Sequence, residues 1–420
     1  MRMLHHDSVR PSCETTCPAP AVPFDLSSPH SPVTAFRALE QQLASHLIER
    51  DEAIHAALLA LVAREHLLLV GPPGTAKSLL VTLLARTIVD ATGQPLPTFS
   101  YLMSRFTTLD DLFGPISLPQ LKLERHVRVT RGRLADVKLA FLDEVLRGSD
   151  PSLEALLTLM NERQFDNDGS RVEVPLLSLF GATNTANLPQ NPDGKIGAVW
   201  DRFLLRLPVA YVQPANFLAL LQQPQAQIAQ AQPWATEADL LQLQQWRSAV
   251  TVPSDIYHLL AQIRVALLEK KLIVSDRRWQ KSVAVVQAQA LLCGRPQVLL
   301  EDLKVLRLTL WQKPEQISEI ARLLIGLVSP FESEILEVRD QAESVVSVHT
   351  EAQHNASLSE EERMKASMEA LAKLKGGLKR LEQLRIQMRE QGLSTTPIDE
   401  AVPAQQALML SIQEYIVSGI

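Results

Sequence analysis

The feature that most constrains the fold is the octapeptide Gly71–Ser78, with the sequence Gly-Pro-Pro-Gly-Thr-Ala-Lys-Ser. It matches G-x-x-x-x-G-K-[ST], a loop whose backbone amides surround the phosphates of a nucleotide. The apolar run His66–Val70 before it suits a buried parallel strand, and leucines at helical spacing follow it from Leu79 to Val89. A strand, a Gly-rich turn and a helix N-terminus together direct unpaired N–H groups and the helix dipole at an anion. The sequence therefore predicts a nucleotide-binding loop here.

Short apolar runs alternate with helical patterns along the first half of the chain. Such alternation is typical of parallel strands connected by helices. The expected strands are Leu67–Val70, Thr98–Leu102, Lys138–Leu142, Leu176–Ala182 and Phe203–Val209. They predict a doubly wound α/β core, with a five-stranded parallel sheet between helices.

Composition narrows the class of protein. A chain of 420 residues is too long for one ordinary core, so two or three domains are expected. The net charge of −6 gives no domain-wide basic field, which disfavours general nucleic-acid binding. The sequence contains no run of 18 apolar residues and no secretory h-region, so we expect a cytoplasmic protein without a membrane span.

Residues 1–33 are expected to be an unstructured leader, because they are rich in Pro and Ser and carry no apolar pattern. Cys13 and Cys17, near His5 and His6, could bind a metal ion, although incidental thiols in a disordered tail are the favoured interpretation. Cys293 is the third cysteine of the chain. This sparse usage is typical of a reducing compartment.

Three further segments are expected after the leader. Residues 34–212 carry the α/β pattern, 213–328 carry almost only helical periodicity after the Gln/Pro/Ala-rich stretch Gln222–Pro233, and 329–420 are helical throughout. The first is predicted to be the nucleotide-binding core and the second an all-α domain. The third is predicted to be a coiled-coil-like segment.

The C-terminal segment has its own apolar period. Its steps of three and four residues average close to 3.5, which favours a coiled-coil seam or a helical hairpin. The seam residues are Met364, Met368, Leu371, Leu374, Leu378, Leu381, Leu384 and Met388. Gly376 and Gly377 weaken the helix by about 1 kcal/mol each. Basic residues outnumber acidic ones between Glu361 and Glu390; a solvated helix face is favoured over an anion-binding surface.

Residues suited to nucleotide hydrolysis follow the loop in order. Lys77 would contact the β- and γ-phosphates, and the Ser78 hydroxyl would coordinate Mg²⁺. The apolar strand before Asp143 and Glu144 ends in two carboxylates. Asp143 suits the Mg²⁺ shell, directly or through water, and Glu144 suits activation of the attacking water. Asn184 ends the next strand, where its amide could orient that water.

Arginines supply the remaining candidates. Arg202 precedes the fifth strand, where its guanidinium could stabilise a neighbouring subunit's γ-phosphate in the transition state. Arg206 is a weaker candidate for a second interface arginine. Arg277 opens a helix after the Ser275 and Asp276 caps, from which it could reach phosphates, and it is preferred to Arg278.

This ordered set resembles the AAA+ ATPases, and among them the MoxR branch, with its greatest similarity to the RavA (regulatory ATPase variant) group. The similarity spans about residues 36–325. It is carried by the phosphate loop and by Leu47–Arg50, Tyr101–Thr108, Leu112–Pro115, Phe141–Glu144, Leu156–Thr158, Asn161–Phe165, Asp201-Arg202 and Val274–Trp279.

The resemblance implies an AAA+ P-loop core followed by an all-α lid. It assigns Asn184 as the sensor-1 residue, Arg202 as a finger acting in trans and Arg277 as the sensor-2 arginine. It places the family's helix-2 insert at Thr107–His126. The nucleotide would be surrounded by Ile48, beside the adenine, and by Gly71, Pro72, Pro73, Gly74, Thr75, Ala76, Lys77, Ser78 and Leu79.

The activity implied by this resemblance is ATP hydrolysis by a homo-oligomeric ring, expected to be a hexamer, with ATP/ADP and Mg²⁺ as ligands. The ring would remodel or mature a client protein together with a von Willebrand factor A (VWA) domain partner. RavA-like proteins can end in a β-rich module, whereas the C-terminal segment here is helical, so that module's partner is not expected. The alternatives are a chelatase-type motor subunit that drives metal insertion and a weakly hydrolysing, nucleotide-regulated scaffold.

Overall fold

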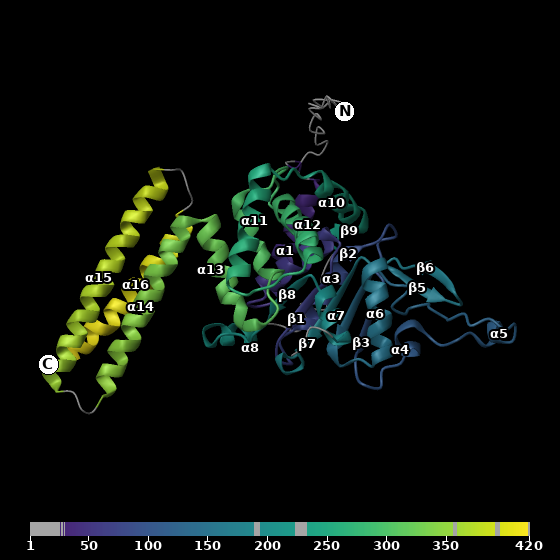
Figure 1. Ribbon diagram of the computed structural model, residues 1–420, viewed down its shortest axis with the longest axis horizontal. Coiled ribbons are helices and arrows are strands. Elements are labelled where there is room, and N and C mark those ends of the chain that lie inside the picture. The colour runs from purple at the N-terminus through teal and green to yellow at the C-terminus, as the bar shows by residue number, and fades with distance from the viewer. Residues whose placement is uncertain are drawn as a thin grey trace, which may run out of the picture.

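The core of the protein is a parallel sheet of five strands in the order β3-β4-β7-β1-β8 (Figure 1). The computed structural model describes Leu26, Ser28 and residues 30–188, 194–222, 233–355, 359–390 and 395–418, so the predictions for Cys13, Cys17 and nearly all of the leader lie outside the described residues. The five predicted strands are confirmed. Their bounds are Leu67–Val70 (β1), Thr98–Leu102 (β3), Leu139–Asp143 (β4), Ser178–Thr183 (β7) and Leu205–Pro208 (β8).

The central strands are apolar on both faces because helices cover the sheet on both sides. Every residue of β1 and β7 is buried. Gly181 of β7 permits close packing there, since a Cβ atom would lie 2.6 Å from the Phe203 ring and 2.8 Å from Leu68. The covering helices of this part are α1 (Pro32–His46), α2 (Asp51–Ala63), α3 (Lys77–Thr87), α6 (Asp150–Glu162) and α7 (Lys195–Arg202).

The predicted insert Thr107–His126 contains two short helices, α4 (Leu109–Phe113) and α5 (Leu118–Leu121). Figure 1 shows α5 at the end of a projection, near the hairpin of β5 (Gln164–Asn167) and β6 (Ser170–Glu173). The sequence analysis missed this hairpin. Its turn is recognisable in retrospect, because Asp168 and Gly169 both have positive φ and Asp-Gly is a preferred hairpin turn.

The next region is helical, apart from the short β9 (Ala235–Thr236), which pairs with β2 (Ile88–Val89). Its long helix α12 packs on α2, and the side chain of Arg37 on α1 donates to the carbonyl of Leu292 at 2.8 Å. This region contains α8 (Phe217–Gln222), α10 (Glu237–Ala249), α11 (Ser254–Glu269), α12 (Asp276–Leu292), the 3-10 helices η4 (Leu300–Leu308) and η5 (Pro314–Gln316), and α13 (Ile317–Val328).

The C-terminal segment is a bundle of α14 (Pro330–His354), α15 (Glu360–Glu390) and α16 (Thr396–Ser418), which stands beside the lid in Figure 1. The predicted seam of α15 is correct from Leu374 onward. Leu371 also packs on the bundle core, but the prediction is wrong at Met368, which is 62% exposed while Ser367 and Ala370 are buried. The reason is a polar contact, because the Ser367 hydroxyl lies 3.0 Å from His349 Nε2 of α14. No helix among the described residues is long and apolar enough to cross a membrane.

Candidate functional site

The phosphate loop joins β1 to α3, and its conformation depends on glycine at two positions. The Gly71 amide donates to the Thr183 carbonyl of β7 at 2.9 Å, and a Cβ atom on Gly71 would lie 2.0 Å from the Val209 carbonyl oxygen. Gly74 has φ 79°, and Ala76 is left-handed as it caps α3. Helix α3 begins at Lys77, with Ser78 exposed on its first turn. The loop thus presents a helix N-terminus to an anion.

Lys77 lies within the loop that it is predicted to serve. Its Nζ donates to the carbonyls of Gly71 (3.1 Å) and Pro72 (2.6 Å) and to the Thr75 hydroxyl (3.2 Å). Burial lowers the pKa of Lys77, while the charges of Asp143 and Glu144 act in the opposite direction. The ammonium and both carboxylates therefore share one electrostatic environment at the carboxyl edge of the sheet.

The two carboxylates stand at the carboxyl end of β4. Asp143 ends the strand, and Glu144 has φ 50°, with its amide donating to Asp143 Oδ1 at 2.9 Å. Asn184 directly follows β7, which lies between β4 and β1, and its side-chain oxygen caps the following 3-10 turn. The edge of the sheet thereby brings together Lys77, Asp143, Glu144 and Asn184, as parallel sheets do at ligand sites.

Asn187 is a site residue that the sequence analysis missed. Its Nδ2 donates to Glu144 Oε2 at 2.8 Å, so it fixes the carboxylate predicted to activate water. The signal was the repeat Asn184-Thr185-Ala186-Asn187, in which the second amide lies one 3-10 turn beyond the first. Asn187 acts as a positioning residue for Glu144.

A cavity of about 580 Å³ adjoins the loop. Ile48, the predicted neighbour of adenine, lines it together with Gly74, Ala76 and Leu79. Its far wall was not anticipated, and is formed by Tyr211, Val212, Phe217, Leu220 and Leu221. The apolar lining and adjoining loop suit a nucleotide base attached to its phosphates.

Arg202 and Arg277 lie at the opposite edge of the sheet. Arg202 ends α7 just before β8, whose Leu205 pairs with Leu67 at the start of β1. Arg277 donates to Asn161 of α6. Burial, and then the charge of Arg277, lower the pKa of Arg202, so the two guanidiniums are close.

The location of Arg277 along the sheet follows from its nearness to His66. The pKa of His66 is lowered to about 3, by burial first and then by the charges of Arg163, Lys281 and Arg277, against a hydrogen bond with the Met160 carbonyl. His66 precedes β1 and Gly71 follows it, five residues later and roughly 16 Å along an extended chain. The structure therefore separates both arginines from the phosphate loop of their own chain.

Comparison with family models identifies the family of this chain. The family model described as "MoxR domain in the MoxR-vWA-beta-propeller ternary systems" matches residues 34–245, half of the chain. The chain belongs to the MoxR family of AAA+ ATPases. A second model, for an AAA lid domain, matches residues 255–324, which cover α11 to α13.

Individual relatives extend the match. Uncharacterized protein MJ0079 of Methanocaldococcus jannaschii is 34% identical over 311 residues, which are 73% of this chain and 77% of that protein. Chaperone MoxR1 of Mycobacterium tuberculosis is 27% identical, over 61% of this chain and 69% of its own length. A crystal structure from Cytophaga hutchinsonii, described as a candidate ATPase, shares the fold with a TM-score of 0.56 and 18% identity, covering 70% of this chain and 94% of that one.

The other two candidate arginines of this MoxR protein are internal. Arg206 is fully buried, and its guanidinium donates to the carbonyls of Trp311 (2.6 Å) and Trp200 (2.9 Å). It also lies 4.2 Å from the Trp200 ring centroid. The structure therefore offers Arg206 no surface on which to reach a neighbouring subunit, and the prediction of an interface arginine is replaced by a structural role.

Arg278 joins the lid to the core. It is 1% exposed, and its guanidinium donates to the carbonyls of Phe203 (2.7 Å) and Leu204 (3.2 Å). Burial lowers its pKa to about 10, against the opposing charge of Asp201. The guanidinium is committed inside the fold, unlike that of Arg277 at the edge.

We predict that Arg206→Met lowers the free energy of unfolding by about 3 kcal/mol, because buried carbonyls of both core and lid lose their donor. Urea denaturation of the full chain measures the change. Arg171→Met, at an exposed arginine of β6, is the matched control and should change stability little. Equal effects of the two substitutions would contradict the assigned role.

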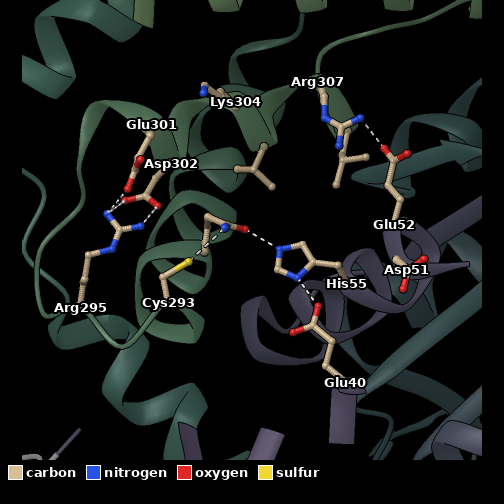
Figure 2. Close-up of a pocket in the computed structure, with 13 residues that line it drawn as sticks. Glu40, Asp51, Glu52, His55, Cys293, Arg295, Glu301, Asp302, Lys304 and Arg307 are labelled. Atoms are coloured by element: carbon tan, nitrogen blue, oxygen red, sulfur yellow. Dashed lines mark hydrogen bonds and ion pairs between the residues drawn. The ribbon is translucent and has the colours of Figure 1, made fainter. Parts of the chain in front are cut away.

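A second cleft, of about 550 Å³, lies where α1 and α2 of the core meet α12 and η4 of the lid (Figure 2). His55 spans this junction, with Nδ1 2.7 Å from Glu40 Oε1 and Nε2 2.7 Å from Gln289 Oε1. An ion pair between Glu52 and Arg307 crosses it as well. These polar contacts connect the core to the lid.

The charge state of His55 favours this connection at low pH. Burial alone would lower its pKa, yet the hydrogen bonds to Glu40 and Gln289 and the charge of Glu40 raise it, against the effect of Arg307. A raised folded-state pKa contributes stability that is complete below the unfolded pKa and is lost as pH rises through the folded one.

We therefore predict that His55→Asn destabilises the protein more at pH 5.5 than at pH 8.5, since only the acidic condition keeps the imidazolium bound to Glu40. Thermal unfolding at both pH values measures the difference. His258→Asn, on the exposed face of α11, is the matched control. An equal loss at the two pH values would show that the imidazolium charge does not contribute.

Proposed function

We propose that this MoxR-family protein is an ATP-hydrolysing ring motor whose active site is shared between neighbouring subunits. The observation that carries the proposal is the separation of the two parts of the site. Lys77, Asp143, Glu144 and Asn184 gather at one edge of the sheet, and Arg202 with Arg277 at the other. In a head-to-tail ring, the arginine edge of one subunit faces the loop edge of the next, so both parts meet only between copies.

The hydrogen-bond donors and cations of the loop fit a nucleoside triphosphate. The amides of the loop and the N-terminus of α3 bind phosphate oxygens, and Lys77 turns its ammonium from the loop carbonyls to the β- and γ-phosphates. Ser78 and Asp143 would hold Mg²⁺, which would supply positive charge to offset that of the phosphates. Ile48 and the walls of the adjoining cavity would receive the adenine.

Glu144 would orient and deprotonate the attacking water, with Asn187 fixing its carboxylate and Asn184 at the neighbouring strand end directing the water to the γ-phosphate. The neighbour's Arg202 would stabilise charge on the transferred phosphoryl group. Among the described residues, Arg202 Nε is buried without a hydrogen-bond partner and the guanidinium makes one long hydrogen bond, to the Ala198 carbonyl at 3.4 Å, so little holds it in place. Arg277 of the same neighbour would sense the nucleotide.

We predict that Glu144→Gln retains ATP binding and lowers turnover by about a hundredfold or more, because the amide cannot accept the proton of water. Nucleotide titration and phosphate release measure the two properties. Glu154→Gln, at an exposed carboxylate of α6, should behave as wild type. Near-normal turnover would reject Glu144 as the base, whereas a wild type that binds ATP without turnover would favour the scaffold alternative.

We predict that mixed rings of Arg202→Ala and Lys77→Ala subunits recover ATPase activity that neither variant has alone. Where the arginine edge of a Lys77→Ala subunit faces the loop edge of an Arg202→Ala subunit, the interface contains an intact loop and an intact Arg202. Phosphate release is measured after mixing, with ring formation followed by mass photometry. Mixtures of Arg171→Ala with Lys77→Ala should reproduce simple dilution of wild type. Rings that contain both variants and stay inactive would contradict the trans role of Arg202.

We further propose a VWA-domain protein as the partner and remodelling of a client protein as the outcome. The family model supports the partner, because it describes MoxR domains in ternary systems with VWA proteins. The remodelling role is supported by the mycobacterial relative, which is named a chaperone. A hexameric ring is the form that the resemblance implies, and the likeness to RavA stays a prediction from the sequence.

A further inference from the structure

Two adjacent glycines, Gly376 and Gly377, lie at the centre of the continuous helix α15. A glycine inside a helix costs about 1 kcal/mol relative to alanine, so each calls for an explanation. Packing explains Gly377, since a Cβ atom there would lie 2.7 Å from Gln405 Nε2 and 3.1 Å from Val338 Cγ1. Gly376 differs, because a Cβ atom would meet nothing within 4 Å and its φ is not positive. Neither packing within the bundle nor backbone conformation requires a glycine at 376.

Gly376 lies on a cavity of about 480 Å³ in the groove between α14 and α15. Its apolar lining comes from Val338, Ala342, Val345 and Leu374, and it is completed by Gln341, Ser344, Lys373, Gly376, Gly377, Arg380 and Gln405. The lining formed by described residues has two cations and no carboxylate. Gln405 is 4% exposed and held by a hydrogen bond from its Nε2 to the Leu374 carbonyl at 3.1 Å.

The surroundings of the groove are basic. The stretch Lys373–Arg380 contains Lys373, Lys375, Lys379 and Arg380 and no acidic residue. Lys373 pairs with Glu369 at 2.9 Å and Arg380 pairs with Glu334, but both pairs are about half exposed. Exposed pairs of this kind contribute little to stability, so their cations can exchange to another carboxylate at small cost.

We propose that this groove binds a segment of a partner protein in which an apolar side chain is flanked by carboxylates. The apolar floor takes the side chain, and Lys373 and Arg380 take the carboxylates. Gly376 lets the peptide backbone approach α15 closely. This is the remaining reason for a glycine at a position where neither packing nor backbone conformation requires one. A cavity of this volume suits one or two side chains, whereas a lipid surface needs a broad apolar face. The inference does not rest on the nucleotide site, since it uses none of its residues.

The test uses the full chain and a panel of fluorescent hexapeptides with Leu, Phe or Trp pairs between Asp and Glu residues. Matched panels replace the acids by Lys or the apolar pair by Ser. We expect acidic–apolar peptides to bind by fluorescence anisotropy, and Gly376→Leu to weaken binding roughly tenfold or more by filling the groove. Because leucine is a better helix former than glycine, this variant should not lower the Tm. Gly376→Ala should weaken binding less.

Charge-reversal variants test the role of the two cations of the groove. Lys373→Glu with Arg380→Glu should abolish binding, whereas Lys365→Glu with Arg389→Glu, on the same helix but outside the groove, should leave it unchanged. The proposal is overturned if no peptide of the panel binds, or if binding is indifferent to Gly376→Leu and to the groove charges. It is equally overturned if phosphatidylglycerol vesicles bind in a manner that needs Lys373 and Arg380 while the peptides do not.

Discussion

The position of the lid depends on two buried guanidiniums. Arg206 extends from β8 to the Trp311 carbonyl beyond η4, and Arg278 extends from the first turn of α12 to the carbonyls just before β8. Asp201 lies 4.0 Å from Arg206 and 3.9 Å from Arg278, so it balances part of their charge. Burying charge is costly, and these hydrogen bonds offset part of that cost only while the first turn of α12 and Trp311 lie against β8 and the carbonyls before it. The two guanidiniums therefore hold this part of the lid against the core.

This placement has a consequence for how nucleotide state could be transmitted. Arg202 ends the helix that carries Asp201, and Arg277 is the direct neighbour of Arg278. A phosphate contact made by Arg202 or Arg277 would thus act within one or two residues of the contacts that hold lid to core. The His55 junction forms a second connection on α2, whose N-cap residue Arg50 donates to the Thr75 carbonyl of the loop at 3.1 Å. A change at a neighbour's nucleotide can bias the lid through these contacts without any movement of the central sheet.

Local patterns in the sequence predicted the core and the loop edge of the site. Val70 to Ser78, and Phe141 to Glu144, are continuous segments whose strand, turn and helix preferences agree with the final structure. What could not be predicted depends on contacts between distant segments. Arg206 looks like a surface arginine until Trp311, far along the chain, closes over it. Asn187 gains its role only because β4 and β7 are neighbours. The α15 seam was wrong at Met368 because the bundle buries the Ser367 hydroxyl and Ala370 on either side of it.

The C-terminal bundle is joined to the lid and so to the same chain of contacts. Lys304 of η4 pairs with Glu332 at the start of α14 at 2.6 Å, and Arg322 of α13 pairs with Asp340 at 3.0 Å. Helix α14 also forms one wall of the proposed peptide groove, while η4 forms part of the cleft beside His55. A lid that rotates with nucleotide state would carry α14 with it, because the packing of α13 on α14 and the partly buried pair of Lys304 with Glu332 resist their separation. A protein segment bound in the groove would then move with the lid, which connects hydrolysis at the loop to a client held more than one domain away.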